Sequence, residues 1–242
     1  MTNNFNKWLE TQLNHVEEFI ANHLPTFYKL LKKVKVLYQR LKYYILKSRG
    51  NYKDIIYDDK FFDKNLEWNT PIAAKLVGVL MDYFHPRSLV DLGCGNAEFL
   101  SEFQKMGVVI QGYEGSQAAI NKALVDKKYI QLFDLRDKID SERKYDLAIC
   151  LEVAEHIENK FSQRLVENLT GLSDTVVFTA ATPGQGGHFH INEQHHEFWR
   201  DIFKQRNYVY EAQITEKLKN DMRVAGVIWW YCDNLMIFKK SV

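Results

Sequence analysis

SLVDLGCGNAEFL, residues 88–100, is the stretch that decides the fold. It starts as a short apolar run, passes through a turn containing Gly93 and Gly95, and continues with the spacing of a helix start. Glycine suits such a turn because a ligand can approach the backbone where a side chain would collide. The stretch therefore predicts a strand, a tight loop and a helix, with the loop facing a bound molecule.

The residues after this loop alternate between short apolar runs and longer amphipathic stretches, which is typical of parallel strands joined by helices. The expected strands cover residues 88–92, 108–113, 129–132, 147–150, 176–180, 208–213 and 234–239. Helices are expected near 70–84, 97–106, 116–126 and 158–171. The last two strands, with Trp229-Trp230-Tyr231 between them, predict an antiparallel hairpin at the sheet's edge. The fold class is α/β, with a seven-stranded, mostly parallel sheet.

The N-terminal part of the chain has a different pattern. Residues 3–23 and 27–48 each show helical spacing, with Pro25 between them and Gly50 at the end. We therefore expect a helical extension over residues 1–50, packed as an antiparallel hairpin or against the main domain, which covers 51–242.

Residues 26–49 carry eight Lys or Arg and no acid, although the whole chain has a net charge of only +1. Residues 29–49 could contact nucleic acid, a membrane surface or an acidic part of the same protein, and a solvated helix face is the plainest interpretation. The cations occur at many angles around the helix, which does not favour a dedicated membrane helix.

Composition sets the general class. The chain is 46% apolar and 26% charged, as globular proteins are. Three widely spaced cysteines, Cys94, Cys150 and Cys232, indicate buried thiols in a reducing compartment. No leader pattern and no run approaching eighteen apolar residues occurs, so no membrane span is expected and the predicted location is the cytoplasm.

Two acids follow the next strands. Glu114 ends the second expected strand, where a carboxylate can bind both hydroxyls of a ribose, and Asp134 follows the third, in reach of an adenine amino group. Together with the glycine loop they predict one crevice at the carboxyl ends of the strands. A nicotinamide dinucleotide is less well suited, because Ala97 stands where a further glycine would face the pyrophosphate.

Residues 57–240 resemble the class I S-adenosylmethionine-dependent methyltransferases, with Asp91-Leu-Gly-Cys-Gly95 as their first motif and Tyr145-Asp-Leu-Ala-Ile-Cys150 as their fourth strand. The resemblance implies a Rossmann-like fold, S-adenosylmethionine as cofactor and S-adenosylhomocysteine as product. It also implies that Asp91, Gly93 and Gly95 line the methionine end, while Asp134 and Leu135 border the adenine. The full expected cofactor set is Asp91, Gly93, Cys94, Gly95, Glu114, Gly115, Asp134, Leu135, Leu151 and Tyr57. The aromatic strip that includes Tyr57 covers either the cofactor or the core.

The methyl acceptor is expected beside Glu152, Glu155 and His156, just after the fourth strand. A histidine there can act as the general base for an acceptor hydroxyl. The glycine- and histidine-rich loop over residues 182–199 can reach the same place, offering Gln185, His190, Asn192 and Gln194 to a polar acceptor. We expect His156, His190 and Glu152 to be the catalytic residues. The string from Gly186 through Gln194 resembles bacterial methyltransferases of sugar or natural-product pathways, which implies a small-molecule or saccharide acceptor.

Two alternatives remain open. Glu152, Glu155, His156 and His195 could bind a divalent metal, as in the similar small-RNA 2′-O-methyltransferases, with RNA as the acceptor. This use of a metal is not favoured, since the Glu-x-x-Glu-His pattern also occurs in metal-free enzymes. The other alternative is a non-catalytic cofactor-binding module, which would have little need of Asp91, Glu114 and Asp134.

Overall fold

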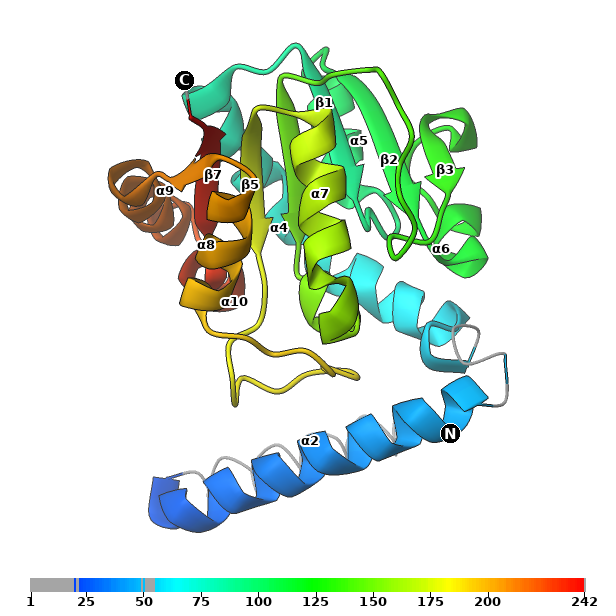
Figure 1. Ribbon diagram of the computed structural model, residues 1–242, viewed down its shortest axis with the longest axis vertical. Coiled ribbons are helices and arrows are strands. Elements are labelled where there is room, and N and C mark those ends of the chain that lie inside the picture. The colour runs from blue at the N-terminus through cyan, green and yellow to red at the C-terminus, as the bar shows by residue number, and fades with distance from the viewer. Residues whose placement is uncertain (1–19, 21, 49, 51–54, 242) are drawn as a thin grey trace.

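The computed structural model describes residues 20, 22–48, 50 and 55–241, which form a seven-stranded sheet with helices on both faces and one long helix below it (Figure 1). The strands are β1 (Ser88–Leu92), β2 (Val109–Glu114), β3 (Ile130–Leu132), β4 (Leu147–Leu151), β5 (Thr175–Thr179), β6 (Tyr208–Tyr210) and β7 (Met236–Lys240). The helices are α2 (Pro25–Ser48), α4 (Asp59–Phe84), α5 (Glu98–Lys105), α6 (Gln117–Asn121), α7 (Ser162–Leu172), α8 (His196–Gln205), α9 (Ala212–Val224) and α10 (Trp229–Asn234).

The sheet has the strand order β3-β2-β1-β4-β5-β7-β6. The first five strands in this order run parallel, and β7 is antiparallel to both β5 and β6. The order reverses between β1 and β4, because the chain leaves β1 towards one edge and β4 towards the other. A crevice at the carboxyl ends of strands is expected at such a reversal. The predicted fold class is confirmed.

The core lies on both sides of the sheet because successive residues of a strand point to opposite faces. In β1, Leu89 packs with α4, α5 and α9 on one face, whereas Val90 packs with α7 and α8 on the other. Figure 1 shows α7 and α8 lying over the near face. Strands buried on both faces read as continuous apolar runs, which is why the sequence predicted β1, β4 and β5 well.

The antiparallel edge differs from the expected hairpin. β6 and β7 are neighbours, but α9 and α10 connect them instead of a turn. The strand expected over 208–213 ends at Tyr210, because Ile214, Leu218 and Met222 recur at intervals of four residues and follow a helix. The tryptophans Trp229 and Trp230 begin α10 and are therefore not part of a loop.

Helix α4 begins eleven residues before the expected start at residue 70. Asp58 is its N-cap, and the Asp58 carboxylate accepts a hydrogen bond of 2.9 Å from the Phe61 amide. Pro71 lies inside α4. The aromatic strip after Tyr57 is therefore the first turn of a helix whose far end packs in the core.

The N-terminal extension is described only in part. The expected first helix, over 3–23, lies almost wholly outside the described residues, so the predicted hairpin is not tested. The second corresponds to α2, which joins the rest of the molecule through a small cluster around Tyr43, Ile56 and Phe189. The boundary at residue 50 stays a prediction. None of the described helices combines the length and apolarity needed to cross a bilayer.

Candidate active site

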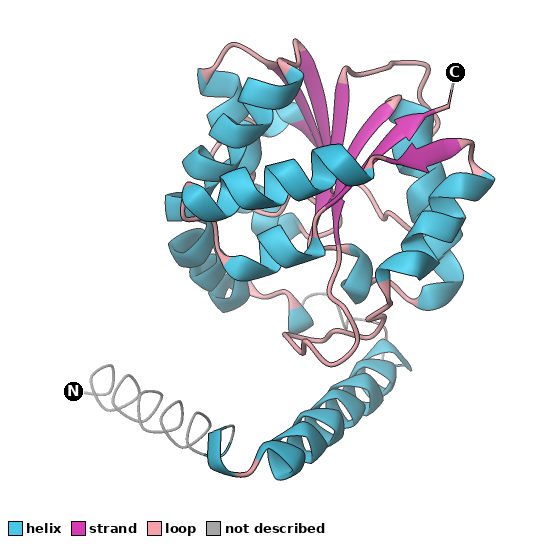
Figure 2. Cartoon of the chain, turned by 90° about the vertical axis from the view of Figure 1, so that its left-hand side faces the viewer, coloured by secondary structure: helices cyan, strands magenta, loops and turns pink. Residues whose placement is uncertain are grey.

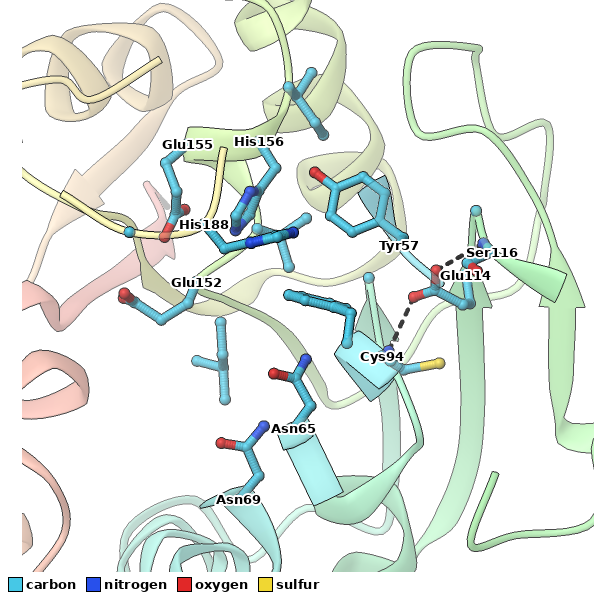
Figure 3. A pocket seen from close by; sticks show the side chains of 18 of the residues that line it. Tyr57, Asn65, Asn69, Cys94, Glu114, Ser116, Glu152, Glu155, His156 and His188 are labelled. Carbon is cyan, nitrogen blue, oxygen red and sulfur yellow. Dashed lines mark hydrogen bonds between the residues drawn. The ribbon is translucent and has the colours of Figure 1, made fainter. Parts of the chain in front are cut away.

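A cavity of about 640 Å³ opens at the carboxyl ends of β1, β2 and β4, where the strand order reverses. Figure 3 shows two groups of polar side chains across it: Glu114 and Ser116 on one side, and Glu152, Glu155 and His156 on the other. The cavity therefore joins the predicted cofactor half to the predicted acceptor half.

The glycine loop is tied to the end of β2. The amides of Gly93 and Cys94 donate to the Tyr113 carbonyl oxygen at 2.8 and 3.3 Å. Gly93 has φ +82°, and a Cβ added there would lie 2.6 Å from Cγ2 of Val153. Only glycine meets both conditions without strain. Ala97 adopts φ +61° at the start of α5, so the alanine in place of a third glycine takes a left-handed conformation.

Glu114 ends β2 at the cavity, as expected. Its carboxylate accepts hydrogen bonds from the amides of Gly95 at 2.9 Å and Ser116 at 2.7 Å. Glu114 thereby links the glycine loop to the loop after β2. Gly115 also lines the cavity.

Asp134 lines the cavity after β3 and is held by an arginine. Arg136 donates to the two Asp134 carboxylate oxygens from Nε at 2.9 Å and Nη2 at 2.5 Å. Leu135 is buried beside it, and Asn168 donates to its carbonyl oxygen at 3.3 Å. The carboxylate that was expected near an adenine is thus engaged in a bidentate ion pair.

Buried acids form the cavity floor near the glycine loop. Burial, with the neighbouring charges of Glu114 and Glu98, raises the pKa of Asp91 well above its ordinary value. Burial is also the main cause that raises the pKa of Glu98 to about 7. One Glu98 carboxylate oxygen and both polar atoms of the Asn96 side chain have no hydrogen-bond partner among the described residues. These groups suit a ligand that is cationic and rich in donors.

Glu152 occupies the turn after β4, with φ +55°. Its carboxylate accepts hydrogen bonds from Asn234 Nδ2 at 2.9 and 3.2 Å, and Gln185 Nε2 lies 3.5 Å away. Burial raises the pKa of Glu152. Glu152 thus faces the cavity from a fixed position, supported by the end of α10 and by the loop after β5.

Glu155 and His156 lie in the 3-10 turn Ala154–His156, and the loop after β5 brings His190 to them. The rings of His156 and His190 are 5.0 Å apart. Burial, and then the charges of His190 and His188, lower the pKa of His156 well below its ordinary value. Nδ1 of His190 lies 3.2 Å from Oε1 of Glu193. The predicted catalytic residues Glu152, His156 and His190 all line the cavity.

The structure brings two residues of the expected metal set, Glu155 and His156, together with His190. Potential ligand atoms of Glu155, His156 and His190 lie within 4.8 Å of one another, and this group contains neither Glu152 nor His195. His195 is exposed at the N-cap of α8. The reason is the path of the loop, where the amides of residues 191 and 192 donate to the Glu155 carbonyl oxygen at 2.9 and 3.0 Å and bring the preceding histidine inward.

Two other loop residues were predicted to bind the acceptor but hold the loop together. Asn192 is buried, and its Nδ2 donates to Ala154 O at 3.3 Å and to Ser162 Oγ at 3.1 Å. Gln194 donates to the Asn192 side-chain oxygen at 2.9 Å. His188, in the same loop, is exposed and stacks on Phe61 with ring centroids 4.8 Å apart.

Tyr57, from the aromatic strip that was expected to cover either the cofactor or the core, lines the cavity, and its ring centroid lies 6.0 Å from that of His156. Several cavity residues were not predicted: Glu98, Asn96, Asn65 and Trp230. Glu98 and Asn96 could have been found from their proximity to Gly95. Asn65 and Trp230 come from helices distant in sequence, and no local pattern marks them as site residues.

Residues 70–214, more than half of the chain, match a family model described as a methyltransferase domain. The chain therefore belongs to this family of methyltransferases, and the predicted class, an S-adenosylmethionine-dependent methyltransferase, is confirmed.

All three cysteines are free and buried, as expected.

Curated relatives match a shorter part of the chain. The ubiquinone biosynthesis O-methyltransferase of Rickettsia bellii is 26% identical over 98 residues, which are 38% of this chain and 41% of that protein. The protein of the same name from Rickettsia conorii is 30% identical over 90 residues, 34% of this chain and 30% of that protein. The chain thus matches less than half the length of these relatives.

Solved structures share the fold. The plantazolicin methyltransferase BpumL, in complex with a pentazolic desmethylPZN analog and SAH, is 16% identical, with a TM-score of 0.56 over 86% of this chain and 99% of that chain. A TehB-like SAM-dependent methyltransferase from Corynebacterium glutamicum is 15% identical, with a TM-score of 0.56 over 76% of this chain and all of that chain. At such low identity the likeness is one of fold alone.

Proposed function

We propose that this protein transfers a methyl group from S-adenosylmethionine to a hydroxyl group of a small or saccharide acceptor. The observation that carries the proposal is one cavity with the glycine loop and Glu114 on one side and His156, with the neighbouring His190, on the other. Methyl transfer needs donor and acceptor aligned in a single enclosed space, because alignment supplies much of the catalysis.

The cofactor half fits S-adenosylmethionine on the chemistry of its side chains. Burial raises the pKa of both Asp91 and Glu98, and the sulfonium and ammonium groups of S-adenosylmethionine would stabilise the charged form of these acids. When bound, S-adenosylmethionine supplies a methyl group on a good leaving group. Asp91, Gly93, Cys94 and Gly95 would hold its methionine end.

The remainder of the expected cofactor set lines the same cavity. Glu114 and Gly115 would face the ribose, while Asp134 and Leu135 would border the adenine. Leu151 and Tyr57 would close the site around the reacting end.

The acceptor half supplies a base. His156 is neutral near pH 7, because its lowered pKa disfavours the imidazolium, and a neutral imidazole can accept the proton of an acceptor hydroxyl. His190 is oriented by Glu193, and Glu152 offers a carboxylate to a second acceptor hydroxyl. Acceptors with two neighbouring polar groups suit this arrangement.

The experiment measures methyl transfer from labelled S-adenosylmethionine to a panel of phenols, catechols and sugars, analysed by mass spectrometry. His156→Ala and His190→Ala should lose transfer while binding S-adenosylmethionine as the wild type does, whereas Glu114→Ala should weaken that binding in calorimetry. The acceptor proposal fails if only nucleic acid is methylated. The cofactor placement fails if Glu114→Ala binds normally.

A second candidate, metal-assisted methyl transfer, is favoured by the group Glu155, His156 and His190. Both Glu155 carboxylate oxygens are buried and make no hydrogen bond with the described residues, and Nδ1 of His156 is likewise without a partner. A divalent cation would satisfy these atoms and could polarise the acceptor hydroxyl as a Lewis acid. Treatment with a chelator followed by dialysis separates the two mechanisms. Loss of activity that Mg²⁺, Mn²⁺ or Zn²⁺ restores supports the metal, and unchanged activity supports the histidine base alone.

A further inference from the structure

Helix α2 presents a continuous apolar face to solvent. The α2 stripe consists of Phe27, Leu30, Leu31, Val34, Leu37, Tyr38, Leu41, Tyr44 and Ile45. Their spacing of three and four residues places them along one face of the helix. Each is between 41% and 68% exposed. A single exposed leucine is ordinary, but a contiguous row of this kind marks an interaction surface.

The stripe faces away from the part of the body that the structure describes. Tyr43 lies about half a helical turn from the middle of the stripe and is buried against Ile56 and Phe189. Lys47, one turn further along the same side, pairs with Glu158. Figure 2 shows α2 extending outside the body, and its C-terminal end is the part that these contacts attach. The stripe itself extends over about 27 Å.

The charge of the segment selects the kind of partner. Residues 26–49 contain eight Lys or Arg and no Asp or Glu. An apolar helix face accompanied by many cations is the composition of helices that lie in the interface of anionic membranes. We propose that α2 binds the surface of a membrane containing anionic lipids, with the α2 stripe inserted among the acyl chains.

Other occupants suit the surface less well. A second copy of the chain packed stripe to stripe would bring two strongly cationic segments together. Nucleic acid would be attracted by the cations, but phosphate contacts make no use of a row of leucines. The angular spread of the cations, which did not favour a membrane helix from the sequence, is compatible with this geometry because long lysine side chains can reach headgroups from the flanks of the helix.

The attachment of α2 to the body also determines which part of the molecule would face the membrane. Tyr43 lines the cavity and Phe189 belongs to the loop that carries His190, so the anchored end of α2 is part of the cavity's surroundings. Binding through the stripe would hold the cavity near the bilayer surface. This proposal does not depend on which reaction the cavity performs.

The test uses the full-length protein and flotation with two kinds of vesicle, phosphatidylcholine alone and an equal mixture of phosphatidylcholine and phosphatidylglycerol. The wild type should float with the anionic vesicles, less so at high salt, and not with the neutral ones. The variant Leu37→Ser with Leu41→Ser keeps the charge and should reduce binding by about tenfold or more, because two inserted side chains are lost. The matched control is Val209→Ser with Val224→Ser, which alters two exposed apolar residues of the body and should bind as the wild type does.

Three results would overturn the proposal. The first is no flotation with anionic vesicles. The second is flotation that the stripe variant retains in full, which would indicate a purely electrostatic attraction. The third is a dimer in analytical ultracentrifugation, or a salt-sensitive complex with RNA, that depends on the stripe while vesicles are not bound.

Discussion

At the scale of single residues, Glu98 links ligand binding to pH. Its pKa is raised to about 7, mainly by burial, so its carboxylate changes charge within the usual working range. A cationic ligand binds better to the ionised form. We therefore expect S-adenosylmethionine to bind up to about tenfold more tightly at pH 8 than at pH 6, since about nine-tenths of the free Glu98 is ionised at pH 8 and about one-tenth at pH 6. Isothermal titration calorimetry at the two values measures this ratio.

The variant Glu98→Gln separates this effect from the titration of the ligand itself. At pH 8 the variant should bind S-adenosylmethionine less tightly than the wild type does. Between pH 6 and pH 8 its affinity should lack the increase that ionisation of Glu98 causes in the wild type. Because the folded pKa of Glu98 lies above its ordinary value of 4.5, wild-type stability from this residue declines as pH rises towards about 7. The variant should consequently unfold at a higher temperature than the wild type at pH 8. Equal pH dependence of binding in both proteins would contradict the assignment.

Gly93 illustrates a residue that sterics alone explain. In Gly93→Ala the new methyl group would meet Val153 at 2.6 Å while the backbone stays at φ +82°. The two costs together should lower the free energy of unfolding by about 2–4 kcal/mol. Gly95→Ala is the matched control, because its φ is +53° and no atom lies within 4 Å of the added carbon. It should lose only about 1 kcal/mol in urea denaturation. Equal losses in the two variants would contradict the role of the Val153 contact.

At the scale of elements, Glu193 organises the loop between β5 and α8. Its carboxylate accepts hydrogen bonds from the amides of Gly184 at 2.8 Å and Gly186 at 2.7 Å, and it also contacts His190. Burial alone would raise the pKa of Glu193, but these hydrogen bonds outweigh it and lower the pKa. Glu193→Gln should free the loop and reduce kcat by about tenfold or more while leaving S-adenosylmethionine binding unchanged.

Hydrogen exchange gives this prediction a structural readout, since the Gly184 and Gly186 amides should exchange faster in the variant. Glu197→Gln is a suitable control, because Glu197 lies in the first turn of α8, a few residues later, and is exposed. If the two variants exchange and react alike, Glu193 does not hold the loop.

Local sequence patterns predicted the elements in the parallel half of the sheet better than those at its edge. The buried central strands appear as apolar runs, and turns with glycine, such as that after β1, separate them clearly. At the edge, the residues that follow Tyr208 have both strand and helix character. They form helix α9 because Leu218 and Met222 pack in the core that α4 also lines. Local patterns contain no information on such distant contacts.

The same distinction applies to the candidate site. Asp91, Gly93 and Glu114 were predicted because each closes a strand at the same edge of the sheet. His190 and His195 could not be distinguished, because the choice depends on hydrogen bonds from the loop backbone to the Glu155 carbonyl oxygen. Asn65, which α4 brings to the cavity, has no marker in the sequence.

At the scale of the whole molecule, the body and α2 are stabilised by separate sets of packed residues. The two large core clusters lie on the faces of the sheet, and Tyr43 belongs to neither. A separate cluster of three buried residues, together with the pair of Lys47 and Glu158, joins α2 to the body. The position of α2 should therefore be sensitive to changes that leave the fold of the body intact.

Tyr43→Ala tests this separation. Tyr43 is only 2% exposed, and its loss should weaken the docking of α2 by about 2–3 kcal/mol, because the ring fills the joint with Ile56 and Phe189. Trypsin should then cleave within residues 29–47 about tenfold faster, while the thermal midpoint of the body changes little. Tyr44→Ala is the matched control, since Tyr44 is the next residue, is exposed and is not one of the three buried residues of the joint. A large fall in the thermal midpoint for Tyr43→Ala would show instead that α2 is an integral part of the core, and equal cleavage of the two variants would remove Tyr43 from the joint.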